Sequence, residues 1–184
     1  MAVVVDDEQL PVQAARAGEA AAWDALFRRY QLPLYVYAFE LLHDEQASLD
    51  AVQETFINAV RHIGGLRDDA KFGSWLFGIA HQKCVQHWRK AWREEPLAVE
   101  EFESEPAAEP NPREWLIRQE DEERLMTLLN QLPLPQRSVL LLHFVEDFSL
   151  EQISAITGAA LGTVKSRLHY AKQALRRLIE ESEP

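Results

Sequence analysis

Side chains suited to nucleic-acid contact are concentrated in one short stretch near the C-terminal end of this 184-residue chain. They combine positive charge with hydrogen-bond donors: Thr163, Lys165, Ser166, Arg167, Tyr170, Lys172, Arg176 and Arg177. Lysine and arginine bind backbone phosphates, whereas threonine, serine and arginine can also bond base edges. Because Thr163, Ser166 and Arg167 come first, the start of this stretch is predicted to reach bases.

The element that must present these side chains is a helix, because apolar residues recur through the same stretch on one helical face. Those residues are Val164, Leu168, Ala171, Leu175 and Leu178. A shorter helix is predicted before it, with Ser149 and Gln152 spaced as a capping box and Gly158 at the turn. Two helices around a glycine turn, the second basic, form the helix-turn-helix pattern. An ordinary helical hairpin with a solvated basic face fits the same periodicity.

Three blocks of this region read LPLPQRSVLLLHF from Leu132, FSLEQISAITG from Phe148 and GTVKSRLHYAKQALRRL from Gly162. They closely resemble region four, the promoter-binding C-terminal domain of bacterial sigma factors, and the extracytoplasmic-function (ECF) group is the nearest match. The resemblance implies that the second helix reads the minus-thirty-five element as duplex DNA. Ala160 departs from the pattern, since the family often has Ser or Thr there, and the missing cap should cost about 1 kcal/mol.

A second polar and basic stripe is predicted on a helix over residues 72–92, at about 100° per residue. The stripe comprises Gln82, Gln86, Arg89 and Arg93, with Lys83 and Lys90 beside it. The block FGSWLFGIA from Phe72 resembles the sigma-factor segment that precedes and begins the helix reading the minus-ten element. The resemblance implies capture of unstacked bases from a melted strand. Gln82 and Gln86 stand where the family commonly has Asn and Asp, so only the location of the readout is carried over.

A helix is also predicted over residues 45–63, with Asp44 as its cap and an apolar inner face. That face comprises Leu49, Val52, Phe56, Ala59 and Ile63. The block DAVQETF from Asp50 is similar to the family's polymerase-binding helix, which docks on the clamp helices of the largest core subunit. Periodicity alone makes the outer polar residues an ordinary solvated face, whereas the resemblance makes them polymerase contacts. They are Asp50, Gln53, Glu54 and Asn58.

Two positions just before this block are neutral where many family members are acidic, within the stretch Ala47–Asp50. Ser48 lies in this gap and Thr55 follows it. Phosphorylation of either would add about −1.5 to −2 charges at pH 7. One hypothesis is that a regulatory kinase thereby strengthens polymerase binding. The simpler alternative is sequence drift, offset by Asp44, Glu45 and other contacts.

Composition predicts an all-α protein of the cytoplasm. Glycine is scarce, at 7 residues, and no alternating strand pattern stands out. No apolar run approaches the about 18 residues of a membrane span, and the N-terminus lacks the basic start of a signal peptide. The single Cys84 excludes an internal disulfide. His81, Cys84 and His87 recur every third residue, but a helix spreads them over about 240° and no fourth ligand is evident. No metal or other cofactor is therefore expected.

The net charge of −11 argues against nucleic-acid binding until its distribution is considered. Residues 94–123 hold 12 acidic and 2 basic residues, whereas residues 61–93 hold 7 basic and 2 acidic ones. The sequence therefore predicts one domain over residues 1–93, a flexible acidic linker over 94–110 and a helix-turn-helix domain over 111–184.

The resemblance covers both domains in the family's order and spacing. It implies a non-catalytic sigma factor that binds core RNA polymerase and promoter DNA, with an anti-sigma factor as a further candidate partner. The alternative is a sigma-like decoy that sequesters an anti-sigma factor without binding promoters, against which the basic face at Lys165–Arg177 argues. A third reading is an ordinary duplex-binding regulator. An enzyme has little support, because no phosphate loop, nucleophile elbow or zinc-protease motif occurs.

Overall fold

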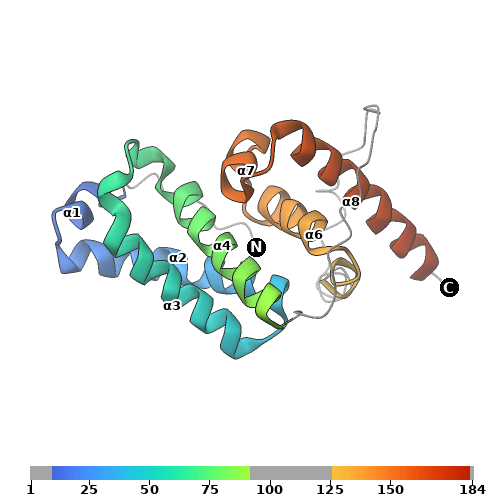
Figure 1. The fold of residues 1–184 in the computed structure, drawn as a ribbon, viewed down its shortest axis with the longest axis horizontal. Coiled ribbons are helices and arrows are strands. Elements are labelled where there is room, and N and C mark those ends of the chain that lie inside the picture. Colours follow the sequence, from blue (N-terminus) through green and yellow to red (C-terminus); the bar gives the residue numbers. More distant parts are fainter. Residues whose placement is uncertain (1–9, 92–125, 183–184) are drawn as a thin grey trace. The chain divides into compact units, whose positions relative to one another are not determined.

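The computed structural model describes residues 10–91 and 126–182, and all regular secondary structure within these ranges is helical (Figure 1). The all-α prediction is confirmed. The chain divides into two compact units, and we call helices α1 to α4 the N-terminal unit and α6 to α8 the C-terminal unit. None of the helices in the described ranges is long and apolar enough to span a membrane. Arg93 and the linker predicted over residues 94–110 lie outside these ranges.

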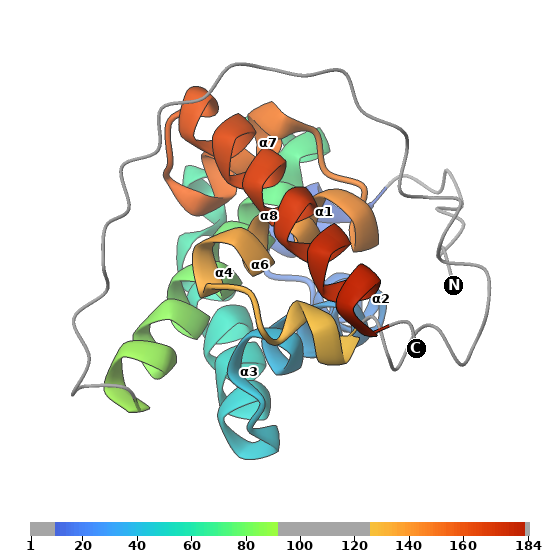
Figure 2. The same ribbon diagram turned by 90° about the vertical axis from the view of Figure 1, so that its right-hand side faces the viewer.

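Three long helices make up most of the N-terminal unit: α2 (Ala20–Leu42), α3 (Glu45–His62) and α4 (Phe72–Ala91). The short helix α1 (Val12–Arg16) precedes them, and a 3-10 turn, η1 (Ile63–Gly65), follows α3. Each long helix packs against the other two, and α3 runs alongside α4 (Figure 2). Their shared core comprises large side chains that are at most 2% exposed: Leu26, Leu34, Tyr37, Leu41, Phe72, Leu76 and Phe77.

Helix α2 continues through Pro33 without interruption. A proline at this position is expected to break or kink a helix, because proline lacks a backbone donor and costs about 3 kcal/mol inside a helix. The expected break does not occur. Leu26 on one side of the proline and Leu34 and Tyr37 on the other are fully buried, so tertiary packing outweighs the local cost.

The buried face of α3 is rotated relative to the prediction. Leu49, expected to face inward, is 48% exposed, whereas Ser48 and Thr55 are fully buried. Ala51 and Ala59 are buried beside them. The other predicted inner residues, Val52, Phe56, Ala59 and Ile63, are buried as expected, so the buried face is shifted toward Ser48 and Thr55 rather than lost.

Helix α3 is capped as predicted, and α4 begins at Phe72, as predicted. The carboxylate of Asp44 accepts the backbone N–H of Ala47 at 2.7 Å, which caps α3. Ser74 does not cap α4: it lies inside that helix and donates to the carbonyl of Lys71 at 3.1 Å. Helix α4 instead continues directly from a 3-10 turn, η2 (Asp69–Lys71).

The C-terminal unit contains α6 (Leu134–Leu140), a π-helical turn η4 (Leu141–Val145), α7 (Leu150–Thr157) and α8 (Leu161–Ser182). Helix α6 and η4 follow each other directly and together cover residues 134–145. Helix α6 packs against α8. The core of the unit includes side chains with no exposed surface: Val139, Leu142, Ile153, Val164 and Ala171.

The turn between α7 and α8 has the predicted chemistry. The Ser149 N–H donates to Gln152 Oε1 at 2.8 Å, and the Gln152 N–H donates to Ser149 Oγ at 3.2 Å, so the capping box is confirmed. Gly158 has φ +70°, the left-handed conformation expected of it. Ser154 Oγ braces the turn by donating to the Ala159 carbonyl at 2.7 Å. The helix-turn-helix prediction is confirmed.

Candidate nucleic-acid interface

Helix α8 carries polar side chains on both sides of its buried face, which is centred on Val164, Leu168 and Ala171. At about 100° per residue, one side holds Thr163, Ser166, Arg167 and Tyr170. The other side holds Lys165, Lys172 and Arg176. A helix with donors on both flanks can bond base edges with its outer surface and phosphates on either side of a groove.

Three of these side chains are anchored by the protein. Arg167 is half-buried, and burial lowers the pKa of its guanidinium, which stays charged at neutral pH. Lys172 Nζ lies 5.5 Å from the centre of the Phe144 ring. The Ser166 hydroxyl donates to the Gly162 carbonyl at 3.0 Å, which leaves its lone pairs to accept. Pre-positioned groups of this kind lose little side-chain entropy on binding.

The predicted stripe of α4 faces outward. Gln82, Gln86 and Arg89 are exposed on the side of the helix opposite to Ala80 and Cys84, which are buried. Lys90 is exposed beside them, and Arg93 lies outside the described residues. This surface offers amide groups that both donate and accept, next to positive charge.

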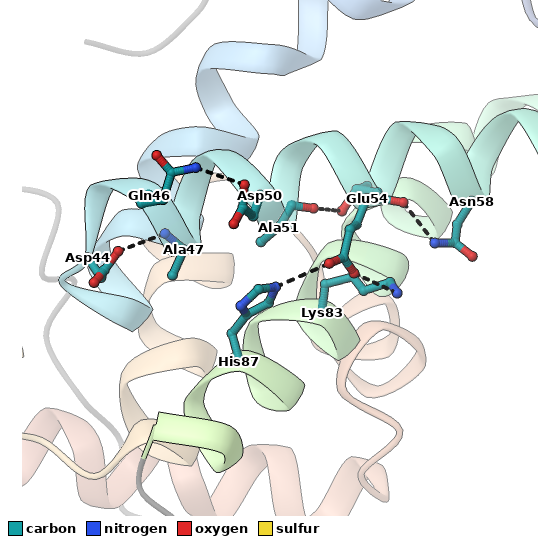
Figure 3. A network of polar contacts seen from close by, with 10 residues as sticks. Asp44, Gln46, Ala47, Asp50, Ala51, Glu54, Asn58, Lys83 and His87 are labelled. Atoms are coloured by element: carbon teal, nitrogen blue, oxygen red, sulfur yellow. Dashed lines mark hydrogen bonds and ion pairs between the residues drawn. The ribbon is translucent and has the colours of Figure 1, made fainter.

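Lys83 does not join that outward stripe. Its ammonium lies 2.8 Å from Glu54 Oε2 on α3, and His87 Nε2 lies 3.5 Å from Glu54 Oε1 (Figure 3). The hydrogen bond from Lys83 holds the pKa of Glu54 below its usual range. A predicted DNA contact and a predicted polymerase contact therefore pair with each other.

The other polar residues predicted on α3 form a mixed set. Gln53 is exposed. Asp50 accepts a hydrogen bond from Gln46 Nε2 at 3.0 Å, and Asn58 donates to the Glu54 carbonyl at 2.8 Å (Figure 3). Gln53 is thus available for a partner, whereas Asp50 and Asn58 also support their own helix.

Comparison with known proteins decides the family. The Sigma-70 region 2 profile matches residues 26–94, and the Sigma-70 region 4 profile matches residues 122–175. The RNA polymerase sigma-H factor of Pseudomonas aeruginosa is 31% identical over 182 residues, which cover 95% of this chain and 94% of that protein. The ECF RNA polymerase sigma factor SigL of Mycobacterium tuberculosis is 32% identical over 171 residues, covering 92% and 96%. The chain belongs to the ECF group of RNA polymerase sigma factors.

Solved structures share the fold of this sigma factor. The sigma factor RpoE, co-crystallised with the anti-sigma factor NepR from Bartonella quintana, matches with a TM-score of 0.66 and 26% identity over 87% of this chain and 98% of that chain. CnrH, solved with the cytosolic domain of CnrY, matches with a TM-score of 0.70 at 21% identity, over 97% and 100% of the chains. The protein directs transcription initiation by RNA polymerase at promoters and is not itself an enzyme.

Sequence reasoning missed an exposed apolar stripe on α3 of the sigma factor. Leu49, Ile57 and Val60 are 48%, 44% and 54% exposed. At about 100° per residue they share one side of the helix with Gln53. Their spacing was the available signal, but Leu49 was assigned to the inner face, which hid it. Exposed apolar side chains gathered on one helix mark an interaction surface.

The two hydroxyls considered for phosphorylation are inaccessible in the folded unit. Ser48 and Thr55 have no exposed surface. Ser48 Oγ donates to the Asp44 carbonyl and Thr55 Oγ1 to the Ala51 carbonyl, each at 2.6 Å. A kinase would reach either residue only after α3 separated from its neighbours, so the burial counts against this form of control.

The residues weighed as zinc ligands on α4 make other contacts. His81 Nδ1 lies 2.8 Å from the Tyr37 hydroxyl, and His87 pairs with Glu54. Cys84 is fully buried, and desolvation raises the pKa of its thiol to about 12. Within the part of the chain that the structure describes, no group of three or more His, Cys, Asp or Glu side chains is placed to hold a metal ion.

Proposed function

We propose that this sigma factor contacts promoters through two surfaces and core RNA polymerase through a third. Helix α8 reads the minus-thirty-five duplex, the outward stripe of α4 holds the melted minus-ten strand, and α3 docks on the polymerase. The proposal assigns region two to residues 1–93 and region four to residues 111–184, with residues 94–110 as an acidic linker. The protein acts in the cytoplasm, where it meets the polymerase.

The two flanks of α8 support its assignment to duplex DNA. Thr163 and Arg167 lie in the first two turns, from which a recognition helix contacts base edges. Lys165 and Arg176 are exposed on the other flank and suit phosphates. Arg167 is the residue best placed for a bidentate contact with a guanine.

The observation that carries the proposal is the outward stripe of α4. Gln82, Gln86 and Arg89 project from the face opposite to the core, within the region 2 match. Unstacked bases expose hydrogen-bonding edges that amide side chains can satisfy, and a neighbouring arginine can follow the backbone. The stripe has the chemistry of a single-strand surface rather than a buried or structural one.

Helix α3 suits a helical protein partner with basic and apolar side chains. Leu49, Ile57 and Val60 supply exposed apolar area, and Gln53 and Asp50 supply polar groups at its edge. Interfaces commonly combine an apolar centre with a polar rim. The charge of Asp50 would speed association with a basic clamp surface more than it would deepen affinity.

An anti-sigma factor is proposed as a further partner. The related RpoE was co-crystallised with the anti-sigma factor NepR. The decoy alternative gains no support, because a decoy that does not bind promoters would not need DNA-binding side chains on both regions. Such side chains are exposed on α4 and on α8: Gln82, Gln86, Arg89, Lys165 and Arg176.

Permanganate footprinting of a cognate promoter tests the assignment of α4. In holoenzyme that carries Gln82→Ala, Gln86→Ala and Arg89→Ala together, the reactivity of the melted thymines should be at least about tenfold lower than with wild-type holoenzyme. Each lost contact costs on the order of 1 kcal/mol. Binding of the same holoenzyme to an isolated minus-thirty-five duplex should not change.

A matched control carries Gln13→Ala and Gln31→Ala, which alter exposed amides on α1 and α2. It should melt the promoter like the wild type. Unchanged thymine reactivity in the triple α4 variant would place the single-strand readout on another surface.

A further inference from the structure

We infer that Glu54 is a positioning residue for promoter melting. From α3 its carboxylate contacts Lys83 and His87 of α4, and these contacts fix the orientation in which α4 presents its outward stripe. This inference rests on the function proposed for α4. It adds a residue from the neighbouring helix, and it moves Lys83 from the DNA contacts to the supporting structure.

The geometry restrains α4 at two points. Lys83 Nζ lies 2.8 Å from Glu54 Oε2, and His87 Nε2 lies 3.5 Å from Glu54 Oε1 (Figure 3). Lys83 and His87 are four residues apart and therefore lie on the same face of α4, one turn from each other. A single carboxylate that uses both oxygens against two successive turns resists rotation and sliding of α4 against α3.

The contacts are adjacent to the readout residues. Lys83 follows Gln82 in the chain, and His87 follows Gln86. Successive residues of a helix point about 100° apart, so holding Lys83 and His87 toward α3 turns Gln82 and Gln86 outward. The orientation of both amides is thus set by groups that do not contact DNA themselves.

Exposure separates Lys83 from the outward cations. The side chains of Lys83 and His87 are only 21% and 23% exposed, whereas Arg89 and Lys90 are exposed. Glu54 compensates the charge of Lys83 within the protein. The positive charge that α4 offers to a DNA strand therefore comes from Arg89 and Lys90.

A charge swap in the full-length protein tests the inference. The single variants are Glu54→Gln and Lys83→Met, and the double variant is Glu54→Lys with Lys83→Glu. The permanganate reactivity of promoter thymines is measured with core polymerase at saturating concentration. Affinity for core polymerase and the thermal unfolding midpoint of the free protein are measured separately. Each single variant should reduce the amount of open complex about threefold to tenfold, with core affinity within about twofold of wild type. The swap should restore promoter melting in part, to at least about twofold above Lys83→Met, because it rebuilds the pair between positions 54 and 83 but not the His87 contact.

The exposed pair Asp24–Arg28, 2.7 Å apart within α2, is the matched control. Exchanging the charges of this pair should leave thymine reactivity, core affinity and the thermal unfolding midpoint unchanged, because both residues belong to the same helix. The thermal unfolding midpoint of every variant should lie within about 3 °C of that of the wild-type protein, since an exposed or half-exposed ion pair contributes less than about 1 kcal/mol to stability.

Two results would overturn the inference while leaving the function proposed for α4 intact. Loss of melting in Lys83→Met without recovery in the swap would make Lys83 a DNA ligand. Loss of core affinity in Glu54→Gln beyond about tenfold would make Glu54 a polymerase contact. In both cases the triple variant of Gln82, Gln86 and Arg89 would still fail to melt the promoter. A wild-type holoenzyme that melts no promoter would overturn both proposals.

Discussion

The hydroxyl of Tyr37 on α2 lies 2.8 Å from Nδ1 of His81 on α4, and the two side chains are 1% and 8% exposed. His81 and Lys83 flank Gln82 in the chain, so at about 100° per residue they point to its two sides. Helix α4 is therefore held by α2 through His81 and by α3 through Lys83. The promoter-facing residues occupy the remaining side.

Replacing Tyr37 by phenylalanine should weaken this anchor. The ring is retained and a buried hydrogen bond is lost, so the free energy of unfolding should fall by about 1–2 kcal/mol. Chemical denaturation of the full chain measures the loss. Tyr35→Phe is the matched control, because Tyr35 lies on the same helix, half-buried against Phe39. An equal effect of the two substitutions would show that the Tyr37–His81 bond contributes nothing.

Glu146, at the end of η4, gives the C-terminal unit a pH dependence. Burial, with a smaller contribution from the charge of Asp147, raises its pKa to about 7. The folded unit therefore holds a proton between about pH 4.5 and pH 7 that the unfolded chain has released, so stability falls as pH rises through this window. Above about pH 7 the cost is complete, at about 3 kcal/mol.

Glu146→Gln should accordingly stabilise the C-terminal unit at pH 8 and have little effect at pH 5. Native-state hydrogen exchange of the α6 and α8 amides reports the stability of that unit alone. Glu180→Gln, on the exposed surface of α8, serves as the control and should show no such dependence. A benefit of Glu146→Gln that is the same at both pH values would rule out the titration.

Arg167 and Arg176 should contribute differently to duplex binding. Arg167→Ala should weaken the cognate minus-thirty-five duplex by about 1–3 kcal/mol and relax specificity at one base pair. Arg176→Ala should weaken all sequences alike and reduce the salt slope by about one. Fluorescence anisotropy on cognate and scrambled duplexes at several salt concentrations separates the two effects. Equal, sequence-independent losses would exclude base reading by Arg167.

The helix-turn-helix was predictable because its signals are local. The Ser149–Gln152 box and the left-handed Gly158 depend on a few neighbouring residues, and both are present as expected. The outward stripe of α4 was predictable for a similar reason, since its residue types and spacing can be identified without knowing which elements pack on the opposite face.

The face of α3 and the course of α2 were not predictable in the same way. Periodicity finds a helix but fixes its rotation only approximately, and small residues such as Ser48 and Ala51 take the contact that Leu49 was expected to fill. Pro33 was expected to interrupt α2, yet burial on both sides of it keeps the helix continuous. The Glu54–Lys83 ion pair joins two helices, so no local sequence pattern in either helix predicts it.

Run-off transcription with purified core RNA polymerase tests most directly whether this chain is a promoter-selecting subunit. Promoters for the assay come from transcript starts mapped after overexpression of the protein. The protein should make core polymerase start at one position on such a template, and changing either the minus-ten or the minus-thirty-five element should reduce the product at least about tenfold. A product no greater than that of core polymerase alone, on every mapped promoter, would contradict the assignment of α4 and α8 to promoter DNA.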